Sequence, residues 1–162
     1  MLTRKSRLLL GLTAAVPLLF AACTDNNIFN PMADAAGTYQ LTVFAGKSIP
    51  APFTIQAGDP SFPQAPNGGT LNVTGGTMSL SNNGTFIETD NYTIIPNDRP
   101  TVQTQYVSSG TWTLNGTTFS LSDPSRSRQV FGTLDADLNN NLTVNYSEDD
   151  GTGTFQQYEY KR

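Results

Sequence analysis

The chain has 162 residues, enough for about one domain, and carries 9 Lys and Arg against 13 Asp and Glu, with no His and a single Cys. One cysteine excludes a disulfide framework, and the lack of His excludes a His-based catalytic triad and leaves a structural zinc site without ligands. The net charge of −4 argues against nucleic-acid binding, which needs a basic surface.

The first 22 residues have the composition of an export signal. Three basic residues stand among the first seven, and residues 8–20 form an apolar stretch of 13 residues, shorter than the about 20 that a spanning helix needs. Cys23 follows directly after two alanines. This arrangement resembles the lipobox of bacterial lipoproteins, which implies that the Cys23 thiol is diacylated and becomes the mature N-terminus. The alternative is an ordinary signal peptide with a chance cysteine.

The mature protein would be acidic and held to a membrane by its lipid. Removal of residues 1–22 takes away three of the nine basic residues, which leaves 6 against 13 acidic residues and a net charge of −7. Anionic headgroups repel such a surface, so attachment has to come from the acyl chains. Thr24 replaces the Asp that favours inner-membrane retention in proteobacterial lipoproteins, so the resemblance implies an outer-membrane location. Residues 24–36 show no clear period, and we interpret residues 23–36 as the lipidated Cys and a flexible tether with a reach of about 20 Å.

From residue 37 onward the pattern has a period of two, with recurring turn signals. Residues 38–43 alternate apolar and polar side chains, which predicts a half-buried strand. Residues 49–55 can return as an edge strand, because Pro50 and Pro52 cannot donate to a ladder. Residues 56–69 are rich in Pro, Gly and Asn and predict the longest loop.

One long, bent strand is predicted over residues 71–80. Leu71 and Val73 share one parity while Met78 and Leu80 share the other, and a β-bulge at Gly75-Gly76 would restore a common face.

The next hairpin decides where two carboxylates point. A three-residue turn at residues 82–84 sets Leu80 opposite Phe86, and a two-residue turn sets it opposite Ile87; we favour the first. In the first register Glu88 and Asp90 face the interior, where paired acids could do acid–base work as in glycosidases. In the second register both face solvent.

The strongest two-residue hairpin signal is Asn115-Gly116, between predicted strands over residues 103–114 and 117–122. Counting outward from this turn places Trp112 opposite Phe119. After a turn at residues 123–125, a strand over residues 130–138 carries its apolar side chains on one face. A three-residue turn at 139–141 then sets Leu134 against Tyr146, and the last strand covers residues 154–160.

These elements amount to about eight to ten strands in an antiparallel meander. Such a meander is most simply closed as an up-and-down barrel, because closure removes exposed edges. A two-sheet β-sandwich is the alternative.

Several turn-and-strand motifs resemble the lipocalin-like domains of bacterial secreted lipoproteins. They are Gly37-Thr38-Tyr39-x-Leu41, Gly69-Thr70-Leu71, Asn83-Gly84-Thr85-Phe86, Gly110-Thr111-Trp112-x-Leu114-x-Gly116 and Tyr160-Lys161-Arg162. The resemblance covers about residues 37–162 and implies a lipocalin-like β-barrel domain, with ligand binding by analogy alone.

Two acidic segments have ordinary interpretations beside their chemical ones. Asp135, Asp137, Asn139 and Asn141 alternate like the start of a calcium loop, but the Gly and Glu of an EF-hand are missing, and a hairpin turns these carboxylates toward solvent. Residues 148–150 are interpreted as a solvated turn. We therefore expect no metal and no cofactor.

Interior aromatic residues could either line a ligand cavity or fill the core. The candidate cavity-lining residues are Tyr39, Leu41, Tyr92, Trp112, Phe119 and Tyr146. We expect a lipid-anchored, non-catalytic cell-envelope protein whose barrel binds a small apolar ligand, in a cavity of about 300 Å³ or more, or a protein partner. A structural or interaction lipoprotein with a filled core is the alternative, and a carboxylate-based enzyme is a third reading.

Overall fold

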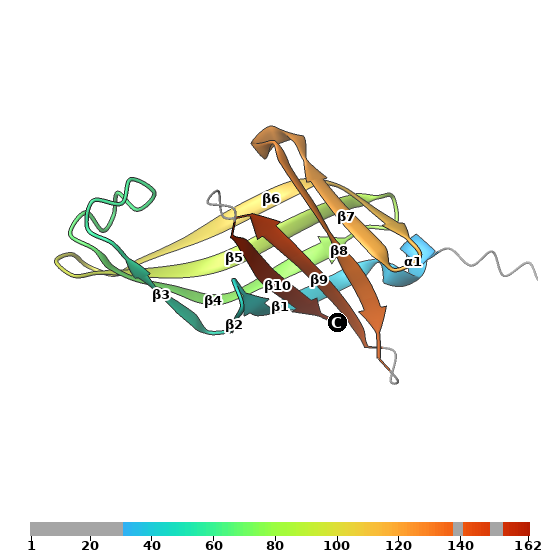
Figure 1. The fold of residues 1–162 in the computed structure, drawn as a ribbon, viewed down its shortest axis with the longest axis horizontal. Helices are drawn as coiled ribbons and strands as arrows, with labels where there is room; N and C mark the ends of the chain where they lie inside the picture. The colour runs from blue at the N-terminus through green and yellow to red at the C-terminus, as the bar shows by residue number, and fades with distance from the viewer. Residues whose placement is uncertain (1–30, 138–140, 150–153) are drawn as a thin grey trace, which may run out of the picture.

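The computed structural model describes residues 31–137, 141–149 and 154–162. Within these residues the chain forms ten strands, one short helix and one 3-10 turn (Figure 1). In chain order they are α1 (Pro31–Ala35), β1 (Gly37–Phe44), β2 (Lys47–Ser48), β3 (Ala51–Ile55), β4 (Gly69–Leu80), β5 (Thr85–Pro96), β6 (Val102–Asn115), β7 (Thr118–Asp123), η1 (Pro124–Arg126), β8 (Arg128–Ala136), β9 (Leu142–Asp149) and β10 (Phe155–Lys161).

Eight of the described strands close into an antiparallel barrel. Consecutive strands from β4 to β10 pair in order, β10 pairs with β1, and β1 returns to β4. In the closing pair Gly37 lies opposite Leu80 and Gln40 opposite Thr77. The prediction of an all-β meander closed as a barrel is confirmed, and the architecture is not the two-sheet sandwich.

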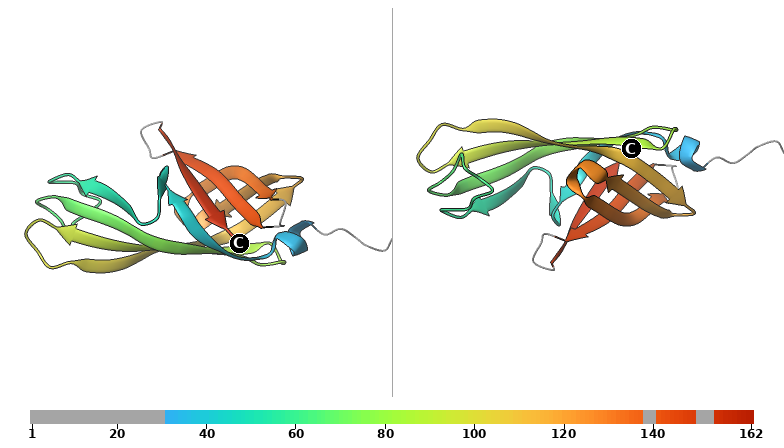
Figure 2. Two further views of the ribbon diagram at one scale, coloured as in Figure 1. Left: turned by 90° about the horizontal axis from the view of Figure 1, so that it is seen from below. Right: turned by 90° about the horizontal axis from the view of Figure 1, so that it is seen from above.

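The barrel carries a long extension on one side, which we call the wing. Only residues 77–80 of β4 pair with β1, so the rest of β4 continues outward together with β5 and β6 (Figure 2). β3 pairs with the free edge of this part of β4, with Ala51 opposite Val73. β3 is an edge strand, as predicted from Pro50 and Pro52.

The predicted bulge in the long strand is present. The register of β4 against β5 shifts between Val73 and Gly75, which leaves Thr74 as the additional residue. The bulge restores the facing, so Val73, Met78 and Leu80 are all buried. It also stands where β4 leaves its pairing with β1 and turns into the wing.

The predicted registers are right in one hairpin and wrong in two. Leu80 lies opposite Phe86, as preferred, and Ile87 is 55% exposed. Trp112 lies opposite Leu121 rather than Phe119, because the two-residue turn is Gly116-Thr117 and not Asn115-Gly116. Gly116 has φ +62. A positive φ at only the first central residue fits a type II′ turn.

The β8–β9 hairpin differs from its prediction in the same way. Leu134 lies opposite Val144 rather than Tyr146, and Ala136 lies opposite Leu142. Each shift moves the partner by two positions, so the inward face is unchanged. Trp112 and Phe119 therefore still pack, with ring centroids 6.1 Å apart.

A helical turn closes one end of the barrel, where the sequence predicted only tether. α1 places Ala35 in the core, and Met32 packs against it. Arg162 donates to the backbone oxygens of Asp34 and Ala36, which fastens α1 to the end of β10. The core at this end is filled by Tyr39, Met78, Leu80, Phe86, Trp112, Phe119, Leu121, Val130 and Val144, among others.

Candidate functional site

The inward-facing side chains of β5 change from apolar to acidic, and then to aromatic and apolar again, along the barrel. Phe86 belongs to the main core, Glu88 and Asp90 follow as buried acids, Tyr92 comes next, and Ile94 belongs to a second apolar cluster under the wing. Because strand side chains alternate, one regular strand places all five on the same side. The open end of the barrel, next to the wing, is therefore polar, while the end covered by α1 is apolar.

Glu88 is the centre of a buried polar cluster that also contains Asp90, Arg128, Tyr146 and Tyr160. Glu88 is 0% exposed and accepts hydrogen bonds from Arg128, from the Tyr146 hydroxyl and, at 2.7 Å, from the Tyr160 hydroxyl. A buried carboxylate is tolerated only when it is paired and hydrogen-bonded in this way. Both Glu88 oxygens are thus engaged, and its role is structural.

Arg128 joins the cluster to the rim of the barrel. Its Nη2 lies 2.9 Å from Glu148 Oε2 and 3.0 Å from the Tyr146 hydroxyl, and its Nη1 donates to Ser108 at 3.2 Å. The interpretation of residues 148–150 as a solvated turn is wrong for Glu148 and Asp149, which lie in β9; Glu148 pairs with this guanidinium, and Asp149 is an exposed strand residue opposite Phe155. Asp150 lies outside the described residues.

Asp90 is held differently from Glu88. Its Oδ1 lies 3.0 Å from the Tyr160 hydroxyl and its Oδ2 lies 3.5 Å from the Tyr92 hydroxyl. Asp90 is 3% exposed, and burial raises the pKa of its carboxyl to about 7, with repulsion from Glu88 acting in the same direction. Asp90 is thus a carboxyl that titrates near neutrality, and among the described residues no basic side chain forms an ion pair with it.

Room for Asp90 comes from a glycine on the neighbouring strand. Gly76 lies opposite Asp90, and a Cβ at this position would clash with the Asp90 carboxylate and with the Thr89 carbonyl. Gly76, one of the two glycines that the sequence assigned to the bulge, therefore gives the buried acid its space, while the extra residue of the bulge itself is Thr74.

Above the polar cluster is a cavity of about 270 Å³, which we call the mouth cavity; it is slightly smaller than the apolar cavity of about 300 Å³ that the sequence led us to expect, and its lining is partly charged. Aromatic rings and charged groups line it: Phe44, Asp90, Tyr92, Tyr106, Arg128, Tyr146, Glu148, Asp149 and Tyr158. The Phe44 ring packs edge-on against Tyr158 at 5.0 Å and Tyr92 at 5.9 Å. Burial raises the pKa of Tyr92, Tyr146 and Tyr158, so their hydroxyls stay neutral.

A second cavity of about 510 Å³, the loop cavity, lies under the long loop that joins β3 to β4. Phe62, Leu71 and Ile94 give it an apolar wall. It shares Phe44, Tyr92 and Tyr106 with the mouth cavity, so the two adjoin.

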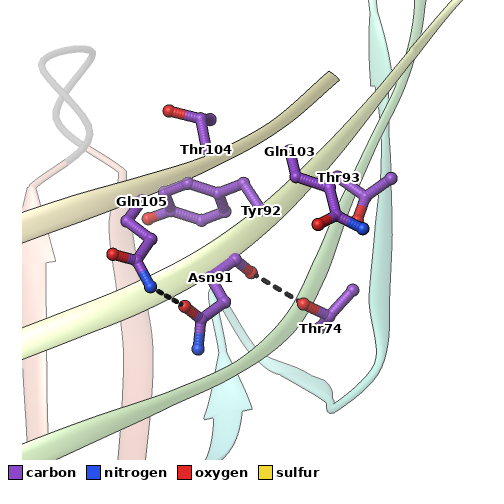
Figure 3. Close-up of a pocket in the computed structure, with 7 residues that line it drawn as sticks. All are labelled: Thr74, Asn91, Tyr92, Thr93, Gln103, Thr104 and Gln105. Carbon is purple, nitrogen blue, oxygen red and sulfur yellow. Dashed lines mark hydrogen bonds between the residues drawn. The ribbon is translucent and has the colours of Figure 1, made fainter. Parts of the chain in front are cut away.

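A larger hollow of about 670 Å³ lies along the wing (Figure 3). Its lining is polar and uncharged: Thr74, Asn91, Tyr92, Thr93, Gln103, Thr104 and Gln105. Its polar groups bond one another, since Gln105 donates to Asn91 Oδ1 at 2.7 Å and Thr74 donates to the Asn91 carbonyl at 3.2 Å. The mouth cavity, with its buried charges, is therefore the stronger candidate site.

The predicted cavity-lining residues fall into two groups. Tyr92 and Tyr146 line the mouth cavity. The other four, Tyr39, Leu41, Trp112 and Phe119, lie in the core of the barrel. The Trp112 indole donates to the Ser81 carbonyl at 2.9 Å, and the Tyr39 hydroxyl donates to the Ala35 carbonyl, so both polar atoms have protein partners. Cys23 lies outside the described residues.

Arg128, Tyr106, Tyr160 and Phe44 belong to the site and were not singled out from the sequence. Arg128 shares the parity of Val130 and Leu134 on β8, so its inward direction could be inferred. Its partners could not, because Glu88 is 40 residues away and reaches it across the barrel.

A third buried acid, Asp123, is held by serine hydroxyls and backbone amides. Its carboxylate accepts hydrogen bonds from the Ser125 hydroxyl at 2.6 Å and the Ser108 hydroxyl at 2.8 Å. The bond from Ser125 is the main cause that lowers the pKa of Asp123 to about 2. Asp123 also caps η1, and we assign it a structural role.

The segment with calcium-like spacing forms local hydrogen bonds. Asp135 accepts from the Thr133 hydroxyl at 2.6 Å, and Asp137 accepts from the backbone and side chain of Asn141. Asn139 lies outside the described residues. The described part of the chain contains no group of three or more His, Cys, Asp or Glu that could hold a metal ion. Within the same part, no helix is long and apolar enough to cross a membrane.

The fold and site define a closed antiparallel barrel with one filled end and one open, polar, aromatic-lined end. No protein-family model matches the chain, and no curated protein shows significant similarity to it. The chemistry of the mouth cavity therefore has to indicate the function.

Proposed function

We propose that the protein is a lipid-anchored, non-catalytic module of the cell envelope whose barrel binds a small ligand at its open end. The observation that carries the proposal is the mouth cavity, where Tyr92, Tyr106, Tyr158 and Phe44 surround a buried carboxyl beside a filled core. Ligand sites are typically concave, with aromatic walls and a few polar groups that fix orientation. Cys23 would supply the anchor, and the acidic surface would keep the barrel off the membrane.

The ligand differs from the wholly apolar molecule that the sequence suggested. Charged and hydroxyl groups line the mouth cavity, while the apolar wall lies in the adjoining loop cavity. A wholly apolar ligand in the mouth would further desolvate Asp90 and the Arg128–Glu148 pair and offer them no hydrogen bond, which is costly. A ligand with one polar end and one apolar end would match the linings of both cavities.

A binding role fits the carboxylates better than an acid–base one. Paired-acid catalysis needs two carboxyls that can both reach a substrate. Of the two buried acids on β5, Glu88 is enclosed by Arg128, Tyr146 and Tyr160 and only Asp90 borders the cavity, while Glu148 at its rim is paired with Arg128. We therefore assign Asp90 to ligand recognition.

The test is ligand-observed NMR on the full chain with Cys23→Ser, which needs no detergent, against a panel of small neutral, cationic and anionic alkyl and aromatic fragments. At least one fragment class should bind saturably. Tyr158→Ala should abolish this binding, whereas Phe155→Ala should preserve it, because Phe155 lies on the same strand but is 70% exposed. Absence of saturable binding, or equal binding to both variants, would refute the ligand role.

A protein-interaction role is the second candidate, and one observation favours it. Phe131 on β8 is 61% exposed and borders a surface groove of about 230 Å³ with Thr133, Asn145, Ser147 and Gln157. Exposed aromatic side chains of this kind are enriched at protein interfaces. If all fragments fail to bind, chemical cross-linking in cells with Phe131→Ser as the comparison tests this role.

A further inference from the structure

The two adjoining cavities have opposite character. In the mouth cavity the described lining places three carboxyl groups, on Asp90, Glu148 and Asp149, against one guanidinium, on Arg128, with Glu88 buried behind it. The loop cavity offers an apolar wall of Phe62, Leu71 and Ile94, and it is also lined by Arg126 and by uncharged polar side chains. Phe44, Tyr92 and Tyr106 form walls of both. A single molecule could therefore place a polar end in one cavity and an apolar end in the other.

The polar end is arranged to receive a hydrogen-bond donor. The 3.5 Å contact from the Tyr92 hydroxyl to Asp90 Oδ2 is longer than a normal O–H···O bond of about 2.5–3.0 Å. Asp90 Oδ2 is thus a buried acceptor on the cavity wall with room for a closer partner. Arg128 donates to Glu88, Glu148, Ser108 and Tyr146, and no bond from it to Asp90 is present.

The aromatic walls favour a positively charged donor. Cations already lie over two of the rings, with the Arg126 guanidinium 4.6 Å from the Tyr106 centroid and that of Arg128 5.5 Å from Tyr146. An ammonium group beside Asp90 would meet ring faces and a carboxylate together, and ring faces attract cations. An anion would instead meet the excess of carboxylates.

We propose that the mouth and loop cavities together bind a small amphipathic amine, with its ammonium group on Asp90 and its alkyl or aryl part against Phe62, Leu71 and Ile94. This inference rests on the proposed ligand-binding function and names the chemical class of the ligand.

The test is calorimetric titration of the full Cys23→Ser chain with three probes of equal length: hexylammonium, hexanol and hexanoate. Hexylammonium should bind about tenfold more tightly than hexanol, since one charge-assisted hydrogen bond is worth about that factor, and hexanoate should bind most weakly. Affinity should rise about three- to fourfold per methylene from butylammonium to hexylammonium, because the chain enters the apolar loop cavity.

Two variants test whether Asp90 is the group that recognises the ammonium charge. Asp90→Asn should lower hexylammonium affinity about tenfold and leave hexanol affinity unchanged. The matched control is Asp135→Asn, which removes the same charge from an exposed position and should change neither affinity. Circular dichroism of each variant verifies folding.

The outcomes separate the two proposals. If hexanol or hexanoate binds as tightly as hexylammonium at the mouth, or if Asp90→Asn has no effect, the amine assignment is wrong while a ligand-binding barrel stands. If none of the three probes binds and the fragment panel also fails, both proposals fall.

Discussion

At the residue scale, Glu88 and Asp90 on β5 show how neighbouring side chains give two carboxyl groups different properties. Glu88 is surrounded by a guanidinium and two hydroxyls, while Asp90, two positions along, is buried with the hydroxyls of Tyr160 and Tyr92 as its hydrogen-bond partners. Burial without a countercharge disfavours the ionised form. Glu88 therefore holds the strands together, and Asp90 keeps a capacity for binding at some cost in stability.

The raised pKa of Asp90 predicts an unusual pH dependence of stability. The unfolded carboxyl loses its proton near pH 3.8, but the folded one does so only near pH 7. Stability from this group is therefore complete below about pH 4 and is lost as the pH rises to 7. Asp90→Asn should remove the dependence and be more stable than wild type at pH 8 by about 2–4 kcal/mol, with little difference at pH 4.

Urea melts at pH 4, 6 and 8 measure this difference. Asp123 does not interfere, because its lowered pKa acts in the opposite direction and only as the pH falls from about 4 to 2. Parallel pH profiles for wild type and Asp90→Asn would contradict the assignment.

A second residue-scale prediction concerns Trp112. The indole is 1% exposed, packs against Phe119 and donates to the Ser81 carbonyl. Trp112→Ala should cost about 3–5 kcal/mol, because it leaves a large cavity in the filled end of the barrel. Trp112→Phe should cost less, since most of the volume remains. Far-UV circular dichroism during urea unfolding measures both, and a loss below about 0.5 kcal/mol for Trp112→Ala would show that the indole contributes little to packing.

At the scale of the element, the β-strand pattern predicted facing better than pairing. The bulge in β4 followed from alternation, and the inward set on β5 followed from alternation together with the favoured three-residue turn, because a slip by one residue would turn each side chain to the other face. The cross-strand partners predicted for Trp112 and Leu134 were each wrong by two positions. A shift of two keeps every side chain on its face, so the apolar pattern is the same in both registers and only the turn geometry distinguishes them.

The site was less predictable than the strands that carry it. The inward direction of Glu88 and Asp90 followed from the hairpin register, but the ring of partners from β8, β9 and β10 depends on how the barrel closes. The wing depends on the same closure, since β4 divides its length between β1 and β3. Such long-range pairing leaves no local signal in the sequence.

Gly116 tests the turn that the structure shows. Its φ of +62 lies in the left-handed region, and a Cβ there would meet nothing within 4 Å. The cost of Gly116→Val is therefore a backbone cost, about 1–2 kcal/mol, and Gly116→Asn should cost less because Asn tolerates this region. Thermal unfolding of both variants checks the order. Equal stability of Gly116→Val and wild type would indicate that the turn is not under this constraint.

At the scale of the whole molecule, the two ends of the barrel differ in how they are covered. α1 and the Arg162 side chain cover the filled end, where the chain enters the barrel from the segment that contains Cys23. The wing extends away from α1 (Figure 1), and the mouth cavity adjoins the loop cavity beside it. A lipid on Cys23 would therefore attach the protein by its filled end and leave the ligand cavity directed away from the membrane.

Cys23→Ser tests this arrangement. The mature chain would carry 6 basic and 13 acidic residues, so its surface has no attraction for anionic headgroups, and the acyl chains would provide all of the membrane affinity. Wild type should remain in the membrane pellet after a high-salt wash, and Cys23→Ser should move to the soluble fraction with its barrel still folded, because the buried core residues of the barrel lie between Ala35 and Tyr160. Immunoblotting of the fractions measures the distribution, and Thr24→Ser is a control that leaves the cysteine in place. Retention of Cys23→Ser in the washed pellet would show that something other than this lipid holds the protein to the membrane.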